Sequence, residues 1–252
     1  MKNDPLPNIA NTYLTGNGHE LLNPHNWPKA VKQYLETQTE IFTAITKNKY
    51  KLILEIGCFD GTYLQWAKKF HKRYVGIDIA TDWLKLGEHR AQLLKSAPDT
   101  YEFLNMDALH LEKIFQKSKL IRKVDPRHII AILPFNVIGN IHDPGKVIRG
   151  LRALSVDYFI SSFSTTKEAT TARHEYYANC DYPGLTRSTS DLGVTFTSVR
   201  GGFSSIAFDE NFYLSASHNA SDHILKYFGG VGIGCFSVRG LNLTEITNLL
   251  IN

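Results

Sequence analysis

Short apolar runs alternate with amphipathic stretches over residues 50–164, and this alternation limits the folds open to the chain more than any other feature. The runs have the length and apolar content of buried strands, and the stretches between them have helical spacing. The expected strands cover residues 50–56, 72–79, 100–107, 127–135 and 156–164, and the expected helices cover residues 61–70, 82–97, 108–118 and 143–154. The pattern predicts an α/β fold with a doubly wound, mostly parallel sheet and helices on both faces, because strand–helix–strand units make right-handed crossovers.

The segment ahead of this core reads differently. Residues 28–48 carry apolar side chains at helical spacing and predict a helix, whereas residues 1–27 are rich in Asn, Pro and Gly and show no period. Residues 1–27 are therefore expected to form a flexible arm or a lid. Tyr13 and Trp27 are candidates to close such a lid, although packing is the simpler role for Trp27.

The segment after the core also leaves the alternation. Residues 166–180 predict a helix, and residues 193–208 predict a β-hairpin that turns at the Arg-Gly-Gly sequence 200–202. Residues 211–228 are mixed and are expected to end in a helix, and residues 230–240 predict a late strand. The doubly wound core is thus expected to carry a β-hairpin insertion.

The absence of any break in composition predicts a single domain over residues 1–252. Within it we expect an N-terminal helical extension or lid (1–49), a ligand-binding core (50–165) and a substrate-side part (166–252). The substrate-side part would hold a helix, the hairpin and the C-terminal strand.

The composition limits the class of protein, its expected partners and its expected location. Hydrophobic residues make up 43% of the 252 residues and charged residues 21%, which is ordinary for a globular protein. The net charge of +4 is small and dispersed, so no nucleic-acid partner is expected. No apolar run reaches a membrane span and no secretory signal is recognisable, so no membrane association is expected. Three cysteines at unrelated spacings fit neither a disulfide framework nor a zinc site, and a cytoplasmic location is the simplest reading. The ten histidines lack metal-ligand spacing, so no metal is expected, and no pattern reveals the oligomeric state.

Acidic, glycine and amide residues stand where the predicted strands end, and in an open α/β sheet ligands bind beyond these carboxyl ends. The first strand leads into Glu55, Gly57 and Gly61, where glycines permit a sharp turn and a close approach to a ligand. The helix that follows offers free N–H groups. The second strand ends at Asp78, where an acid can accept hydrogen bonds from both hydroxyls of a ribose. The third strand ends at Asp107, which can accept a hydrogen bond from an adenine amino group. The fourth ends in Leu-Pro-Phe-Asn at 133–136.

Together these residues resemble the class I S-adenosylmethionine (SAM)-dependent methyltransferase family, whose fold is Rossmann-like. The family's first loop reads acid, any residue, then Gly-x-Gly-x-Gly. Here Gly57 and Gly61 match, and Phe59 replaces the middle glycine. A pyrophosphate needs the closest backbone approach, whereas SAM carries no phosphate, so a bulkier loop is tolerable. The resemblance covers residues 50–165 and implies that SAM is the cofactor.

The resemblance also implies a role for each matching residue. Glu55, Gly57 and Gly61 would line the methionine moiety and its turn, with Cys58 a small residue of the same loop. Asp78 would hold the ribose. The remaining expected cofactor contacts are Ile79 on the adenine, Asp107 at its amino group with Met106 and Ala108 beside it, and Pro134 and Phe135 after the fourth strand. Asn136 falls where the family often places a polar group near the methyl.

Two adjacent tyrosines, Tyr176 and Tyr177, follow the fifth strand and are candidate catalytic residues together with Asn136. The plain alternative is a helix that buries one tyrosine and exposes the other. The functional interpretation is an aromatic wall, because a tyrosine face attracts a sulfonium cation by about 0.5–2 kcal/mol. His142, His174 and Asp143 are candidate general bases by position only, and a surface or capping role is the better explanation for each of them.

Three functions remain open from the sequence. The first is a SAM-dependent methyltransferase acting on a small-molecule or carrier-bound metabolite. The second is a SAM-cyclising enzyme, a reaction that this fold and a tyrosine-lined sulfonium pocket resemble. There the substrate's own amine displaces methylthioadenosine and closes azetidine-2-carboxylate. The third is a SAM-binding module without catalysis. Incubation with SAM alone separates the first two by their products.

Overall fold

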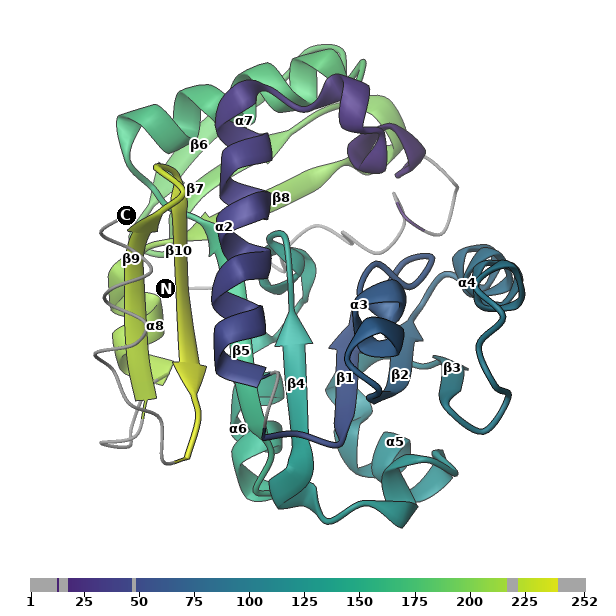
Figure 1. Ribbon diagram of the computed structural model, residues 1–252. Coiled ribbons are helices and arrows are strands. Elements are labelled where there is room, and N and C mark those ends of the chain that lie inside the picture. The colour runs from purple at the N-terminus through teal and green to yellow at the C-terminus, as the bar shows by residue number, and fades with distance from the viewer. Residues whose placement is uncertain (1–12, 14–17, 47–48, 217–221, 240–252) are drawn as a thin grey trace.

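Seven strands form one mixed sheet in the order β3-β2-β1-β4-β5-β10-β9 (Figure 1). The computed structural model describes residue 13 and residues 18–46, 49–216 and 222–239. The parallel strands are β1 (Leu52–Ile56), β2 (Arg73–Asp78), β3 (Tyr101–Asn105), β4 (Ile129–Leu133) and β5 (Asp157–Phe163). β10 (Gly232–Ser237) runs antiparallel to β5 and to β9 (Asp222–Phe228). The winding reverses between β1 and β4, which is where doubly wound sheets bind ligands. The predicted fold class is confirmed.

Helices cover both faces of the sheet, as the buried strands require. Successive side chains of a strand point to opposite faces, so Ile53 packs in one hydrophobic cluster and Leu52 and Leu54 in the other. The first face carries α2 (Lys29–Thr46), α3 (Leu64–Lys69) and α4 (Thr81–Leu93), and the second carries α5 (Leu111–Lys117), α6 (Pro144–Ala153) and α8 (Glu210–Ala216). No helix among the described residues is long and apolar enough to cross a membrane.

A second sheet and one helix lie above the carboxyl ends of the parallel strands. The helix is α7 (Lys167–Asn179), and the three antiparallel strands are β6 (Thr186–Ser190), β7 (Gly193–Thr197) and β8 (Ser204–Phe208). Figure 1 shows these four elements, called the roof below, at the upper end of the molecule. The predicted hairpin is β7 and β8, joined through η7 (Arg200–Gly202).

Two expectations for the C-terminal part need correction. The helix expected at the end of residues 211–228 is wrong, because helix α8 comes first and Asp222–Phe228 form strand β9. The strand conformation of β9 is set by its pairing with β10 across a turn at Gly229 and Gly230, both of which have positive φ. Sequence reasoning also missed β6, whose five residues are all exposed and carry no apolar pattern.

The segment before β1 borders the open end of the sheet. Two short 3-10 helices, η1 (His19–Leu22) and η2 (Pro24–Asn26), lead into α2, which buries an apolar stripe against the sheet. The Tyr34 hydroxyl forms a 2.7 Å hydrogen bond with Ser161 Oγ on β5, so α2 is fixed over the strand. The remaining 3-10 helices are η3 (Ala108–His110), η4 (Ile121–Lys123), η5 (Pro126–His128) and η6 (Val137–Asn140).

A buried carboxylate, Asp157 at the start of β5, joins three parts of the chain. It accepts a 2.6 Å hydrogen bond from the Tyr50 hydroxyl and pairs with Arg239 Nε at 2.8 Å and Lys49 Nζ at 3.2 Å. Its side chain is 4% exposed. The amino end of β5 is therefore tied to the residues that precede β1 and follow β10.

We expect Asp157→Asn to lower the free energy of unfolding by about 2–3 kcal/mol, because charge-assisted hydrogen bonds to a buried group are lost. Urea denaturation measures the change. Asp125→Asn is the matched control: it removes an Arg127 ion pair at the surface and should leave the unfolding midpoint in place. Equal midpoints for all three proteins would contradict the structural role of Asp157.

Candidate functional site

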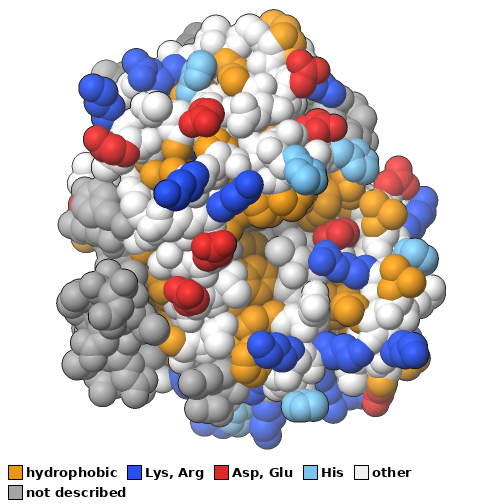
Figure 2. Space-filling view, turned by 45° about the horizontal axis from the view of Figure 1, so that its top comes forward, with side chains coloured by type: hydrophobic (Ala, Val, Ile, Leu, Met, Phe, Trp, Pro, Cys, Tyr) orange, Lys and Arg blue, Asp and Glu red, His pale blue; other side chains and the backbone are white. Residues whose placement is uncertain are grey.

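A cavity of about 1520 Å³ opens at the carboxyl ends of the parallel strands. Its walls come from the loops after β1, β2, β3 and β4, from α2 and the segment before it, and from the roof. Figure 2 shows the molecule hollowed here, with hydrophobic side chains inside and charged ones around the opening. The strand-end residues singled out in the sequence therefore border one cavity, with the exceptions given below.

The loop after β1 turns sharply at the edge of the cavity. Gly57 lines the cavity and has φ of +67°, and a Cβ there would lie 2.6 Å from Cγ1 of Val137. Phe59 has φ of +54°, its N–H donates to Asp78 Oδ2 at 2.9 Å, and its ring lies 3.6 Å from the Trp83 ring between centroids. A phenylalanine fits at this position because its ring packs on α4.

Three other residues expected at the ligand are buried: Glu55 near the end of β1, and Cys58 and Gly61 in the loop. Glu55 is fully buried, and its Oε2 accepts hydrogen bonds from the Tyr63 N–H at 3.0 Å and the Tyr74 hydroxyl at 2.6 Å. Burial raises the pKa of Glu55 to about 8. Glu55, Cys58 and Gly61 do not line the cavity. Their expected contacts with the ligand stay predictions, and in the structure Glu55 supports the loop from below.

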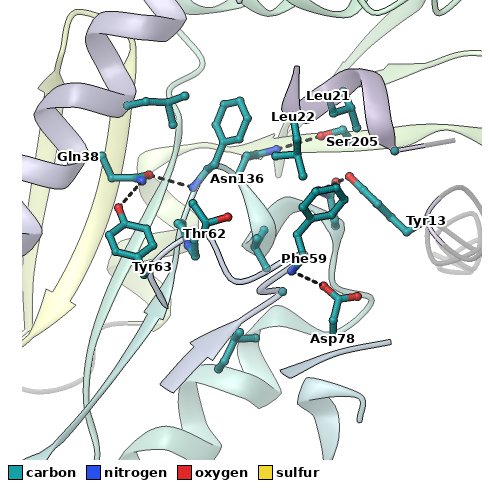
Figure 3. A pocket seen from close by; sticks show the side chains of 18 of the residues that line it. Tyr13, Leu21, Leu22, Gln38, Phe59, Thr62, Tyr63, Asp78, Asn136 and Ser205 are labelled. Atoms are coloured by element: carbon teal, nitrogen blue, oxygen red, sulfur yellow. Dashed lines mark hydrogen bonds between the residues drawn. The ribbon is translucent and has the colours of Figure 1, made fainter. Parts of the chain in front are cut away.

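The acids at the ends of β2 and β3 both line the cavity (Figure 3 shows Asp78). Asp78 Oδ1 accepts from the Ala80 N–H at 2.9 Å, and burial raises the pKa of its carboxyl above the usual value. Asp107 is exposed and accepts from the Leu109 N–H at 2.8 Å, as a helix cap does. The expected neighbours also line the cavity: Ile79, Met106, Ala108, Pro134 and Phe135.

Asn136 reaches the cavity in the left-handed conformation, with φ of +62°. Its side chain is committed to protein partners. Nδ2 donates to Ser205 Oγ at 3.0 Å and to the Ile206 carbonyl at 3.1 Å, and Oδ1 accepts from the Ser162 hydroxyl. The expected role of its amide in orienting a substrate amine therefore changes to a positioning role that joins β4, β5 and β8.

Both tyrosines of α7 are buried, with exposures of 2% for Tyr176 and 3% for Tyr177, and both line the cavity. The alternative in which one is exposed is wrong. The Tyr176 hydroxyl donates to the Leu21 carbonyl, so it holds the segment before α2 against the roof. The Tyr177 hydroxyl donates to Ser205 Oγ at 3.1 Å. Burial raises the pKa of Tyr176 well above its ordinary value, so the phenol stays neutral.

The structure separates the three candidate bases. His142 lines the cavity at its exposed rim. Asp143 caps α6 by accepting from the Lys146 N–H at 2.9 Å, and His174 lies outside the cavity near the Phe196 ring.

Sequence reasoning missed several lining residues that come from distant elements. Gln38 on α2 is 2% exposed, donates to the Tyr63 hydroxyl at 2.9 Å and accepts from the Phe135 N–H at 2.9 Å (Figure 3). A polar residue on the apolar stripe of the helix, four positions after Tyr34, was the available signal. Phe203, which precedes β8, and Ser205 of the roof had no such signal. Trp27, which the sequence did offer as a lid candidate, lines the cavity, and its indole N–H donates to the Leu21 carbonyl at 3.0 Å.

The lid residue predicted from the sequence, Tyr13, lies across the cavity from Gln38 (Figure 3). Its hydroxyl accepts a 2.8 Å hydrogen bond from Asn140 Nδ2. Most of residues 1–17 lie outside the described residues, so the lid as a whole stays a prediction.

Solved structures with this fold include known methyltransferases. The PH0226 protein from Pyrococcus horikoshii OT3 aligns with a TM-score of 0.59 and 13% identity over 85% of this chain and 95% of that one. The plantazolicin methyltransferase BamL was solved in complex with a triazolic desmethylPZN analog and S-adenosylhomocysteine (SAH). It aligns with a TM-score of 0.56 and 14% identity over 97% of this chain and 84% of that one. Magnesium protoporphyrin IX methyltransferase (ChlM) from Synechocystis PCC 6803, with bound SAH, aligns with a TM-score of 0.53 and 12% identity over 92% of this chain and 97% of that one. No family model and no curated protein matches in sequence. The chain has the fold of class I SAM-dependent methyltransferases.

The raised pKa of Glu55 predicts a pH-dependent stability. The folded state keeps this proton up to about pH 8, whereas an unfolded chain releases it near pH 4.5. The folded state then binds more protons, so this group should lower the free energy of unfolding as pH rises between those values, by at most about 1.4 kcal/mol per pH unit. Glu55→Gln should remove this contribution. Urea denaturation from pH 5 to 8.5 measures the difference between the two proteins, and a difference independent of pH would contradict the assignment.

Proposed function

We propose that the protein is a SAM-dependent methyltransferase that acts on a small molecule. The observation that carries the proposal is one cavity that is bordered by Gly57, Asp78 and Asp107 and is larger than one ligand requires. Its volume is about 1520 Å³, whereas pockets for single small ligands measure roughly 300–1,000 Å³. SAM would occupy the side formed by the strand ends, and the space under the roof would receive a methyl acceptor.

In this proposal the adenosine end of SAM lies along β2 and β3. Asp78 would accept the ribose hydroxyls, and Asp107 would accept the adenine amino group. Ile79, Met106 and Ala108 would pack against the base. The methionine end would pass Gly57 toward Phe135, whose ring centroid lies 5.5 Å from that of Tyr176. A sulfonium that lies beside these rings would be stabilised by cation–π attraction.

Methyl transfer from SAM is an in-line displacement in which a bond from the acceptor to the methyl carbon forms as the sulfur–carbon bond breaks. The products are the methylated acceptor and SAH, and the acceptor releases its proton. Positioning and exclusion of water supply much of the rate in such a reaction. The aromatic walls of the cavity would contribute both to positioning and to the exclusion of water. His142, the candidate base that lines the cavity at its rim, would take the proton in this proposal.

A second candidate function is cyclisation of SAM, which the tyrosine-lined reacting end also supports. It needs no acceptor and releases methylthioadenosine. Incubation with SAM alone, followed by mass spectrometry, tests the choice: we expect no methylthioadenosine above the enzyme-free rate. Enzyme-dependent methylthioadenosine would favour cyclisation or lysis, and binding without turnover of any acceptor would favour a SAM-binding module. The cytoplasmic location and the absence of a nucleic-acid partner stay predictions, as does a carrier-bound acceptor.

We expect Asp78→Ala to weaken SAM binding by about 1.5–3 kcal/mol, because charge-assisted hydrogen bonds to the ribose are lost. Isothermal titration calorimetry with SAM measures the affinity. Asp82→Ala, which removes an exposed acid of neighbouring helix α4, is the control and should bind like the wild type. Unchanged affinity in a folded Asp78 variant would remove Asp78 from the site.

We expect Tyr176→Phe to lower turnover while leaving SAM affinity within about twofold, because the ring stays beside the sulfonium and the bond to the Leu21 carbonyl is lost. Amide hydrogen exchange over residues 18–27 should rise. Tyr176→Ala should cost more turnover, since the ring face is lost as well. Unchanged exchange and turnover in the Phe variant would show that the Leu21 bond does not matter for closure.

A further inference from the structure

The part of the cavity under the roof is walled by aromatic rings that are almost fully buried. The Tyr177 ring centroid lies 5.0 Å from that of Tyr176 and 4.9 Å from that of Phe203. Phe163 on β5 and Tyr176 complete this wall, with ring centroids 6.4 Å apart. The four rings are 1–3% exposed. Flat faces of this kind bind a ring-containing ligand by dispersion and burial of apolar area.

The charged residues that line the cavity stand elsewhere. Lys32, Glu36, Glu40 and His142 are exposed at the rim, and Asp78 and Asp107 lie at the ends of β2 and β3. A charged ligand group under the roof would therefore lose its hydration without meeting an opposite charge among the lining residues, which is costly.

One cation, Arg173 on α7, lies behind the aromatic wall. It is fully buried, and its guanidinium donates to the carbonyls of Val194 and Ser205, both at 3.0 Å. The rings of Tyr177 and Phe163 lie 5.6 and 5.7 Å from it and stand at the edge of the cavity, which Arg173 itself does not line. Its charge makes this end of the cavity electropositive, so an electron-rich atom is favoured there and a cation is disfavoured.

Ser205 supplies the polar contact on this side. Its Oγ accepts hydrogen bonds from Asn136 Nδ2 at 3.0 Å and from the Tyr177 hydroxyl at 3.1 Å. A serine hydroxyl has two acceptor positions and one donor. With both acceptor positions occupied, the capacity that remains is the O–H donor, and Ser205 lines the cavity (Figure 3). This side of the cavity therefore favours a ligand that has a hydrogen-bond acceptor.

We infer that the methyl acceptor is an uncharged, ring-containing molecule whose carbonyl oxygen accepts the Ser205 hydrogen bond. This inference rests on the proposed function, since it assigns SAM to the rest of the cavity. Ser205 is a specificity-determining residue in this assignment, and the rings of Tyr176, Tyr177, Phe203 and Phe163 supply the apolar contact. A carboxylate is a poor fit because a single neutral donor does not replace its hydration.

Four naphthalene probes test the inference on the SAH-saturated protein: 2-acetonaphthone, 2-ethylnaphthalene, 2-naphthoate and 1-(2-naphthyl)ethylamine. They share a ring system and differ in charge and in the carbonyl oxygen. We expect 2-acetonaphthone to bind about fivefold to tenfold more tightly than 2-ethylnaphthalene, as one hydrogen bond provides. The two charged probes should bind more weakly than either. Calorimetry or tryptophan fluorescence gives the affinities.

Variants assign the preference to one hydroxyl. Ser205→Ala should lower the affinity for 2-acetonaphthone to that for 2-ethylnaphthalene. The affinity for 2-ethylnaphthalene should stay within about twofold of the wild-type value. Ser204→Ala, at the buried neighbouring position of β8 outside the cavity, should keep the wild-type preference. Tyr177→Phe should also keep it, since the Ser205 donor remains. Thermal denaturation confirms that each variant is folded.

Each outcome has one meaning. Equal affinity for the ketone and the hydrocarbon, tighter binding of a charged probe, or no binding of any probe overturns the inference when SAH itself binds. A preference that survives Ser205→Ala also overturns it. Failure to bind SAH overturns the proposed function, and the inference with it.

Discussion

The side chain of Asn136 forms the junction on which the ligand cavity depends. Its amide bonds simultaneously to the Ser162 hydroxyl of β5 and to Ser205 and Ile206 of β8, and its backbone N–H donates to the Ser161 carbonyl. The residue is 2% exposed, so each partner that it loses would leave a buried polar group unpaired, at about 1–3 kcal/mol. The inserted roof is thereby fixed over the switch point of the main sheet, and the tyrosines of α7 are brought to the same cavity as the strand-end acids.

The core of the fold could be predicted because its signals are local. The buried parallel strands are continuous apolar runs, and the helices between them carry an apolar stripe, so period and length suffice. Strands β6 and β9 fail this test for a physical reason. Every residue of β6 is exposed, and β9 owes its extended backbone to pairing with β10 across Gly229 and Gly230. Pairing between distant segments leaves little trace in a short stretch of sequence.

The candidate site divides in the same way. Asp78, Asp107 and Asn136 could be placed at one edge because parallel strands end together. Which way each side chain points could not be predicted: Glu55 precedes the glycine turn yet faces Tyr74 below it. The contributions of Gln38 and Ser205 depend on how α2 and the roof pack against the strands. The rule that ligands bind at the carboxyl ends of parallel strands says nothing about residues on α2 or the roof.

The segment before α2 is attached to its surroundings mainly through its own backbone. The Leu21 carbonyl accepts from the indole of Trp27 and the hydroxyl of Tyr176, and the Glu20 carbonyl accepts from Asn26 and from the Cys180 thiol. Every amino acid carries such a carbonyl, so side chains at positions 21 and 22 can change without loosening these attachments. Leu21 and Leu22 both line the cavity. Selection can therefore reshape this wall for a new ligand without losing these hydrogen bonds, which makes the segment a place where related enzymes are free to diverge in specificity.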